Sequence, residues 1–467
     1  MTRDLTDVVK AYDIRGVVPD QWGAAEAAAL GAATADVLAR PGTSLVVGHD
    51  MRPSSPELVR AFARGAAARG TDVVLVGLVS TDGLYYASGA LNSPGAMFTA
   101  SHNPAQYNGI KLCRAGAQAV GQETGLAEIR RRAATYLSDG LDQAPRTGEI
   151  TERDVLADYA RHLRSLVDLS TGRRLSVVVD AGNGMAGHTV PAVLGEAAGL
   201  PELPLRIEPL YFELDGTFPN HEANPLEPEN LRDLQAAVVE HHADLGLAFD
   251  GDADRCFVVD EQGRPVSPSA ITALVALREV SKELAAGHEP TILHNLITSA
   301  AVPELVRAAG GTPVRTKVGH SNIKALMATS GAIFGGEHSA HYYFREFWGA
   351  DTGMLAAMHV LAALQQSAGT LSALVSDYDR YISSGEINSR IADVPAAITR
   401  VRAAFEGRGE LDELDGTTFS ALDGPMWWFS LRASNTEPLL RLNVEAADTA
   451  TMEGIRDEVL DLVRADQ

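Results

Sequence analysis

The stretch SLVVGHDMRPSSPELVRAFARGAAARGTDVVLVGLV, residues 44–79, holds the pattern that decides the fold. Two short valine-rich runs flank a segment whose apolar residues recur at helical spacing, so we expect a strand, a helix and a second strand. The same alternation returns at residues 174–210 and again at residues 289–318. This repetition predicts an α/β fold with three such units in series.

The last hundred residues have a different pattern. Strand-like segments at 426–434 and 438–448 precede a helical segment at 452–465, which predicts a smaller C-terminal α+β domain. Loop-forming residues cluster at 139–150, and a polar stretch covers 364–389. We therefore expect four domains, with the boundaries 1–148, 149–255, 256–370 and 371–467.

Composition restricts the partners of the chain. Its 467 residues carry 39 Lys and Arg against 61 Asp and Glu, a formal charge of -22, which argues against nucleic acid or an anionic membrane as the main partner. Two cysteines, Cys113 and Cys256, are too few for a disulfide framework. The first ten residues lack the apolar core of a secretory signal, so we expect a cytoplasmic protein.

The segment LGLAFDGDADRCFVVDE, residues 245–261, places three carboxylates between two apolar strands. In an extended loop, Asp250, Asp252 and Asp254 would point the same way and converge on one hard cation. Between buried strands they would repel one another strongly without a cation. The segment therefore predicts a metal site, with room on Mg²⁺ for a phosphate oxygen.

The segment GNGMAG, residues 182–187, matches a dinucleotide-binding pattern after a predicted strand. No acidic residue ends the next strand at a suitable position, because Glu208 is followed at once by Pro209. We interpret the glycines as a tight strand-to-helix turn.

The segment FTASHNPAQYNGIKL, residues 98–112, runs from a strand into a lone serine and an Asn-Pro turn before the strand pattern resumes. Ser101 lies where loops carry function, so it is either a nucleophile or part of an ordinary turn. Serine hydrolysis through Ser101 and His102 is disfavoured, because adjacent residues on an extended chain point apart.

Three further segments carry polar residues suited to a sugar phosphate. Residues 431–442 combine hydroxyls with arginines, which suits a phosphate dianion. Residues 315–326 bring basic groups before a helix that begins near Ser321. In residues 334–344, Glu337, Ser339 and His341 alternate on what we expect to be one extended piece, able to meet sugar hydroxyls and move protons.

Together these segments resemble the α-D-phosphohexomutase family, most closely its bacterial phosphomannomutase/phosphoglucomutase branch. The resemblance covers nearly the whole chain in order, through KAYDIRG, TASHNP, NGIKL, FDGDADR, KVGHSNIK, GEHSAHYYF and RASNTEPLLRLNVE. It implies three related α/β mixed-sheet domains and a smaller C-terminal domain around a central cleft.

The resemblance also implies roles for particular residues. Ser101 would carry the phosphoryl group, and Ser101, Asp250, Asp252 and Asp254 would hold Mg²⁺. Lys111, Arg15 and His341 would share proton transfer and charge stabilisation, with no choice among them from sequence. The expected substrate-binding residues are His102, Arg255, Lys317, Gly319, His320, Glu337, Ser339, Arg432, Ser434, Asn435, Thr436 and Arg441.

The implied reaction moves phosphate reversibly between C1 and C6 of a hexose phosphate, mannose or glucose, through a hexose 1,6-bisphosphate. Ala340 would add a methyl group beside Ser339 and narrow the sugar loop, which weighs mildly against an amino sugar. Phosphoglucosamine mutase is therefore the alternative within the same class. A phosphohydrolase and a catalytically silent sugar-phosphate-binding protein are alternatives from other classes.

Overall fold

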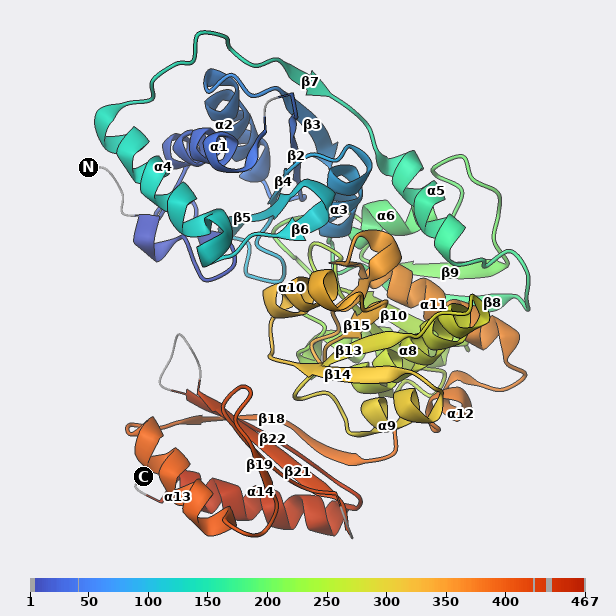
Figure 1. Cartoon of the computed structure of the whole chain (residues 1–467). Coiled ribbons are helices and arrows are strands. Elements are labelled where there is room, and N and C mark those ends of the chain that lie inside the picture. The colour runs from blue at the N-terminus through green and yellow to red at the C-terminus, as the bar shows by residue number, and fades with distance from the viewer. Residues whose placement is uncertain (1–4, 41, 423–424, 434–438, 466–467) are drawn as a thin grey trace.

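The computed structural model describes residues 5–40, 42–422, 425–433 and 439–465. Four sheets follow one another along the chain, and Figure 1 shows the four units in an arc from the blue N-terminal unit to the red C-terminal one. The predicted α/β class, with three mixed sheets and a smaller α+β unit, is confirmed. No described helix combines the length and apolar character that a bilayer-spanning segment needs.

The first sheet has the strand order β1-β5-β4-β2-β3-β7, with β6 paired to β5. Its strands are β1 (Ile14–Val17), β2 (Leu45–His49), β3 (Val73–Leu78), β4 (Gly95–Phe98), β5 (Tyr107–Arg114), β6 (Gln118–Ala119) and β7 (Ile150–Glu152). Its helices are α1 (Ala24–Leu38), α2 (Ser55–Ala68), α3 (Thr81–Ala90) and α4 (Ala127–Asp139), with the short turns η1 (Leu5–Asp7), η2 (Ala115–Ala117) and η3 (Gln122–Leu126).

The second sheet has the order β12-β11-β10-β8-β9, and the third has the order β14-β13-β15-β16-β17. The second domain contains α5 (Leu156–Leu166), β8 (Leu175–Asp180), α6 (Ala186–Val193), β9 (Leu205–Leu210), η4 (Pro228–Leu231), α7 (Arg232–Glu240), β10 (Leu245–Phe249), β11 (Cys256–Asp260) and β12 (Pro265–Val266). The third contains α8 (Pro268–Ala285), β13 (Thr291–Asn295), α9 (Ala301–Ala308), β14 (Thr312–Thr316), α10 (His320–Ser330), β15 (Phe334–Gly336), β16 (Tyr342–Phe344), η5 (Arg345–Phe347), β17 (Ala350–Asp351), α11 (Gly353–Gln366) and α12 (Leu371–Val375).

The fourth sheet, in the order β18-β22-β21-β20-β19, is antiparallel throughout its described pairs. This domain contains β18 (Ile382–Arg390), α13 (Val394–Phe405), β19 (Glu410–Asp412), β20 (Thr417–Ala421), β21 (Trp427–Ala433), β22 (Leu439–Ala446) and α14 (Thr449–Val463).

The first three sheets share one strand arrangement. Three parallel strands, in the orders β3-β2-β4, β9-β8-β10 and β14-β13-β15, are followed by an antiparallel strand, β5, β11 or β16. The connection into that antiparallel strand therefore occupies an equivalent place in each domain. These connections are residues 99–106, 250–255 and 337–341, which are the three loops that the sequence analysis singled out.

Strand pairing moves the expected domain boundaries. The division between 255 and 256 falls inside the β10–β11 hairpin. Its five residue pairs hold both ends of residues 250–255, the predicted metal loop, in one sheet. We place it after Val266 instead, where the second sheet ends and α8 begins. In the same way, β7 pairs with β3 and extends the first domain to Glu152, and the fourth sheet begins only at Ile382.

The glycines of residues 182–187 form the strand-to-helix turn that the sequence predicted. Gly182 has a φ of 50°, in the left-handed region, between β8 and α6. A Cβ on Gly184 would lie 2.7 Å from the carbonyl oxygen of Gly251, so the turn packs directly against the metal loop.

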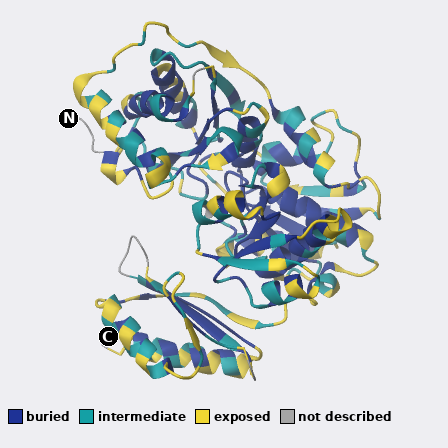
Figure 2. Cartoon of the chain, viewed as in Figure 1, coloured by how far each residue is buried: buried dark blue, intermediate teal, exposed yellow. Residues whose placement is uncertain are grey.

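The buried hydrophobic residues form clusters of unequal extent along the chain. The second and third domains share one continuous cluster, which includes Val177 and Ile292, whereas the fourth has its own cluster around Phe405 and Phe429. Figure 2 shows the buried strands of the fourth domain apart from the larger buried region above them. Described contacts from the fourth domain to the third include polar ones such as Ala300 N–H to Glu445 Oε2, 2.9 Å. A domain joined in this way is expected to move as a body.

Asp82 joins the first three domains to one another. Its buried carboxylate accepts hydrogen bonds from Ser80, from the Tyr159 hydroxyl at 2.7 Å and from Thr352 Oγ1 at 2.7 Å. Tyr159 lies on α5 of the second domain, and Thr352 caps α11 of the third. One side chain thereby links three domains.

Asp82→Ala is expected to lower the free energy of unfolding by about 2–4 kcal/mol, because it leaves buried hydroxyl donors without an acceptor. Urea denaturation would measure the change. The matched control is Asp158→Ala, whose exposed pair with Arg161 should contribute no more than about 1 kcal/mol. Equal losses in the two variants would contradict the role of Asp82.

Candidate active site

A cavity of about 310 Å³ opens where the first three domains meet. The sequence analysis had named seven of the residues that line it: Arg15, Ser101, His102, Lys111, Asp254, Arg255 and His341. These residues lie far apart in the sequence: five come from the equivalent loops of the three sheets, and Arg15 and Lys111 come from strands β1 and β5.

Ser101 occupies a tight turn directly after β4. Its φ is 50°, and its hydroxyl donates a hydrogen bond of 2.8 Å to Asp250 Oδ2 of the second domain. The chains approach so closely that a Cβ on Gly251 would lie 2.4 Å from the Ser101 carbonyl oxygen. The serine is only 6% exposed, so its environment is set by the protein rather than by water.

The relation between Ser101 and His102 corrects an expectation. We expected their side chains to point apart, yet His102 Nδ1 lies 3.1 Å from Ser101 Oγ, because the left-handed turn replaces the extended chain we had assumed. Arg255 Nη2 donates to the same nitrogen at 2.7 Å. Burial and the Arg255 charge lower the pKa of His102 to about 2, so it stays neutral and is a poor base for serine hydrolysis.

The three aspartates converge, but not along an extended loop. Ala253 has a φ of 60° and its N–H bonds to the Asp250 carbonyl at 3.0 Å, so residues 250–255 form a tight turn. One carboxylate oxygen from each of Asp250, Asp252 and Asp254 lies within 4.8 Å of the others. All three residues are at most 1% exposed.

Two basic side chains offset this buried negative charge. Lys111 Nζ lies 2.6 Å from Asp252 Oδ2 and 2.5 Å from Asp254 Oδ2, and Arg255 Nε donates to Asp250 Oδ2 at 3.0 Å. Burial lowers the pKa of Lys111, but the carboxylates outweigh burial and hold it above its ordinary value. We had expected only a metal ion to relieve the repulsion among the carboxylates. Lys111 and Arg255 already relieve part of it.

The carboxylate cluster still fits a hard cation. Within the described chain, Asp252 Oδ1 and Asp254 Oδ1 are buried with no hydrogen-bond partner. Buried carboxylate oxygens normally have partners, and oxygen ligands at this spacing suit Mg²⁺ or a similar cation. Asp250, Asp252 and Asp254 are thus the residues able to hold one.

Arg15 reaches the serine loop because β1 pairs with β5, where Arg15 lies opposite Gly109. Its guanidinium donates to Asn103 Oδ1 and to Asp13 Oδ2, each at 2.6 Å. The Arg15 guanidinium therefore lines the cavity in a fixed orientation.

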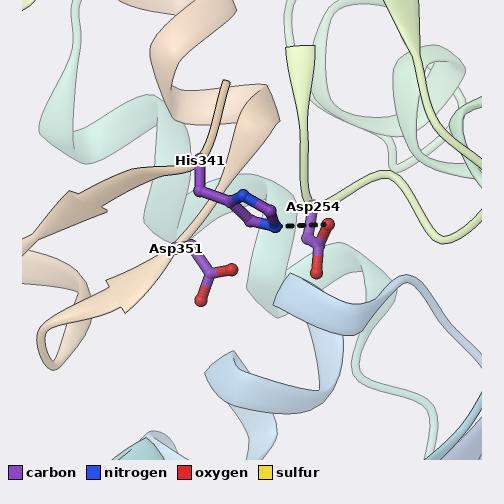
Figure 3. Close-up of side chains that lie close together, drawn as sticks. All are labelled: Asp254, His341 and Asp351. Carbon is purple, nitrogen blue, oxygen red and sulfur yellow. Dashed lines mark ion pairs between the residues drawn. The ribbon is translucent and has the colours of Figure 1, made fainter. Parts of the chain in front are cut away.

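His341 enters the cavity from the third domain. Figure 3 shows its ring pointing toward Asp254, with Asp351 beside it, and Nε2 lies 3.8 Å from Asp254 Oδ1. An antiparallel bridge between His341 and Arg255 fixes the two loops together. Asp254, His341 and Asp351 could also gather around an ion, but Lys324 already pairs with Asp351 at 2.6 Å.

Residues 337–341, the predicted sugar loop, form a hairpin turn rather than the extended piece we expected. The Ala340 N–H bonds to the Glu337 carbonyl at 3.1 Å, because the loop must reverse between the antiparallel strands β15 and β16. Ala340 is fully buried and does not line the cavity, so the effect of its methyl group on the choice of sugar stays a prediction. Ser339 Oγ lies 3.0 Å from His341 Nδ1.

Glu337 is held by its own domain. Its carboxylate accepts hydrogen bonds from the Gly319 N–H at 3.0 Å and from the Tyr343 hydroxyl at 2.7 Å. Gly319 is therefore tied to the sugar loop, whereas Lys317 is exposed. His320 is the first residue of α10, and its side chain lies outside the described part of the chain.

The expected phosphate clamp lies on the fourth domain, outside the cavity. Arg432 and Arg441 both pair with Glu386, at 3.4 and 3.5 Å. Burial lowers the pKa of Arg432, and nearby carboxylates that include Glu337 oppose this shift, so the clamp lies within electrostatic reach of the sugar loop. Ser434, Asn435 and Thr436 lie outside the described residues.

Comparisons with known proteins agree with this arrangement. The four domain models of phosphoglucomutase/phosphomannomutase match in order: alpha/beta/alpha domain I at residues 6–138, domain II at 157–263, domain III at 267–381, and the C-terminal domain at 386–462. The chain belongs to this family.

Relatives and a solved structure extend the match over nearly the full length. A phosphomannomutase of Escherichia coli is 40% identical over 97% of this chain and 98% of its own. A phosphomannomutase/phosphoglucomutase of Pseudomonas aeruginosa is 39% identical over 96% and 94%. The crystal structure of a phosphoglucomutase/phosphomannomutase family protein from Burkholderia thailandensis has a TM-score of 0.86 at 32% identity, covering 98% of both chains.

Several residues around this phosphohexomutase cavity escaped the sequence analysis. Tyr12, Asp13, Tyr85 and Asp351 line it, and Lys324 places its Nζ 3.9 Å from the centre of the Tyr85 ring. Tyr12 and Asp13 stand in KAYDIRG and Lys324 ends KVGHSNIK, so the quoted motifs contained them. Tyr85 and Asp351 lay outside every quoted motif.

Asp254→Asn is expected to weaken divalent-cation binding about tenfold or more, because a neutral amide replaces a charged oxygen ligand. Isothermal titration with Mg²⁺ measures the change, with Asp461→Asn on the exposed face of α14 as the matched control. Equal affinities in wild type and Asp254→Asn would remove the aspartate from the metal site.

Proposed function

We propose that the chain is a phosphomannomutase/phosphoglucomutase, which moves phosphate between C1 and C6 of a hexose phosphate by way of phosphorylated Ser101. The observation that carries the proposal is the 2.8 Å contact between the Ser101 hydroxyl and Asp250, within a cluster of buried carboxylates from another domain. A surface turn has no need of this arrangement, whereas a serine that exchanges a dianionic group beside a cation does.

The cation in this proposal is Mg²⁺, held by Asp250, Asp252 and Asp254 together with an oxygen of the phosphoserine. When bound, it neutralises charge on the transferring phosphoryl group. Lys111 and Arg255, already paired with the carboxylates, supply further positive charge on the same side of the cavity. Phosphoryl transfer depends mainly on such positioning and electrostatic stabilisation.

In the first transfer, the Ser101 Oγ–P bond breaks and a bond forms from phosphorus to the free hydroxyl of the sugar phosphate. The hydroxyl proton must move to a nearby base, and the Ser101 oxygen released from phosphorus must take up a proton. Lys111 is held as a cation by two carboxylates and Arg15 offers a planar guanidinium with several donors, so both suit charge stabilisation. His341 is the remaining candidate, because its imidazole lines the cavity and imidazole is a common general acid and base.

The product of this step is a hexose 1,6-bisphosphate, which must turn end for end before the second phosphate reaches Ser101. Glu337 and Ser339 lie between the serine loop and the clamp in this proposal and would bind the sugar's O3 and O4 in both orientations. The fourth domain, with its own core, can open and close over the intermediate. O3 and O4 are alike in mannose and glucose, so both sugars are proposed substrates.

Ser101→Ala is expected to abolish mutase turnover, with a loss of at least about 10⁴-fold, because the phosphoryl carrier is gone. A coupled assay that follows conversion of glucose 1-phosphate to glucose 6-phosphate measures it. Circular dichroism should show an unchanged fold, and the matched control Ser138→Ala, on the exposed face of α4, should keep full activity. Normal turnover in folded Ser101→Ala would refute the proposal.

Arg432→Ala is expected to raise KM about tenfold or more with a smaller effect on kcat, because it removes a charge-assisted contact to the phosphate that is not reacting. Steady-state kinetics give both constants. Arg408→Ala, which breaks an exposed pair with Glu458 in the same domain, is the matched control and should change neither. An unchanged KM in Arg432→Ala would take Arg432 out of the clamp.

A further inference from the structure

Arg52 is a buried arginine that the proposed chemistry does not use. It stands between β2 and α2, and its side chain has no solvent exposure. Its guanidinium donates to the main-chain carbonyls of Ser101 at 2.9 Å, Asn103 at 2.6 Å, Pro104 at 2.8 Å and Tyr107 at 2.9 Å. A single side chain therefore binds three carbonyl groups of the loop that carries the reactive serine and a fourth at the start of β5.

A second set of contacts fixes the guanidinium itself. Asp50 Oδ2 accepts from Arg52 Nε at 3.2 Å, and Asp50 Oδ1 accepts from the Arg52 N–H at 3.0 Å and from Ser55 Oγ at 2.8 Å. Asn108 Nδ2 in turn donates to Ser55 Oγ at 2.9 Å. The chain of bonds runs from the serine loop through Arg52 and back to the start of β5, so the loop is closed on itself.

The second domain covers this arginine. The ring of Phe218 lies 5.1 Å from the guanidinium carbon, and a Cβ on Gly216 would lie 2.6 Å from the Arg52 Cα. The same domain carries Asp250, the partner of the Ser101 hydroxyl. Arg52 thus lies between the serine loop and the domain that holds the metal ligands.

We propose that Arg52 is the positioning residue of the phosphoserine loop, an inference that rests on the proposed function of Ser101. By binding the four carbonyls, Arg52 holds Ser101 in the left-handed conformation that directs its hydroxyl at Asp250 while the phosphoryl group leaves and returns. A carrier loop must keep the same geometry in its free and phosphorylated forms, although the charge beside it changes by about 1.5 to 2 units.

The chemistry of the site requires arginine in particular. The planar guanidinium offers five donors in a fixed fork, and Arg52 uses them on carbonyls and on Asp50 together. A lysine at this position keeps the charge but offers three donors from a single nitrogen, which cannot reach the same set of acceptors. Arg52→Lys therefore keeps the positive charge and removes most of the hydrogen bonds that position the loop.

The test is steady-state kinetics of Arg52→Lys with glucose 1-phosphate. The turnover rate is divided by the concentration of folded protein that glucose 1,6-bisphosphate phosphorylates on Ser101. We expect kcat to fall about 100-fold, since a misplacement of about 1 Å costs that much, with KM changed less than about threefold. Arg64→Lys, on the exposed face of helix α2, which follows Arg52 in the chain, is the matched control and should behave as wild type.

A second variant, Asp50→Asn, keeps Arg52 but weakens the contact that orients it, and should lower kcat about tenfold at unchanged KM. It carries the test if Arg52→Lys fails to fold. A kcat per phosphorylated site equal to that of wild type, in whichever variant folds, would overturn the positioning role and leave only a structural one. Absence of turnover in wild type would instead overturn the proposed function, so the two failures are distinguishable.

Discussion

The balance of buried charge beside Ser101 is the constraint on which the rest of the structure depends. Three carboxylates of the second domain are removed from water, and they are tolerable there only because Lys111 of the first domain and Arg255 pair with them. The Lys111 pairs cross the boundary between the first and second domains, so the charge balance requires these two domains to dock as they do. Two carboxylate oxygens without partners in the described chain then leave a place for a cation, and the serine hydroxyl lies at its edge.

One structural arrangement, repeated, supplies the parts of the site. In each of the first three domains the connection from the third parallel strand into the antiparallel strand faces the cavity, and these connections carry the serine, the aspartates and the sugar loop in turn. Asp82 and the shared core of the second and third domains keep these three loops rigid with respect to one another. The fourth domain has a separate core and carries Arg432 and Arg441, which we propose as the phosphate clamp. A rigid reaction centre with a movable distal contact suits a reaction whose intermediate must turn within the site.

The sequence predicted the α/β class, the C-terminal α+β unit and the loops that gather at the cavity, because strand and helix periodicity and short motifs are local. It did not predict loop shape. Residues 250–255 and 337–341 were expected to be extended, and both are turns, because Ala253 and Ala340 adopt left-handed conformations that depend on their packing. The pairing of Lys111 with the aspartates, and the role of Arg52, arise from contacts between residues distant in sequence, which no local pattern records. The domain boundary at 255 failed for the same reason, since strand pairing is a long-range property.

The central claim, that Ser101 carries the transferred phosphate, is tested most directly by mass spectrometry of the Ser101 peptide from purified protein. The peptide is measured before and after exposure to glucose 1,6-bisphosphate with Mg²⁺, and again after addition of a hexose monophosphate as the phosphoryl acceptor. The account predicts a phosphate on Ser101 that appears with the bisphosphate and is lost to a hexose monophosphate. A folded protein whose Ser101 never carries phosphate would contradict it.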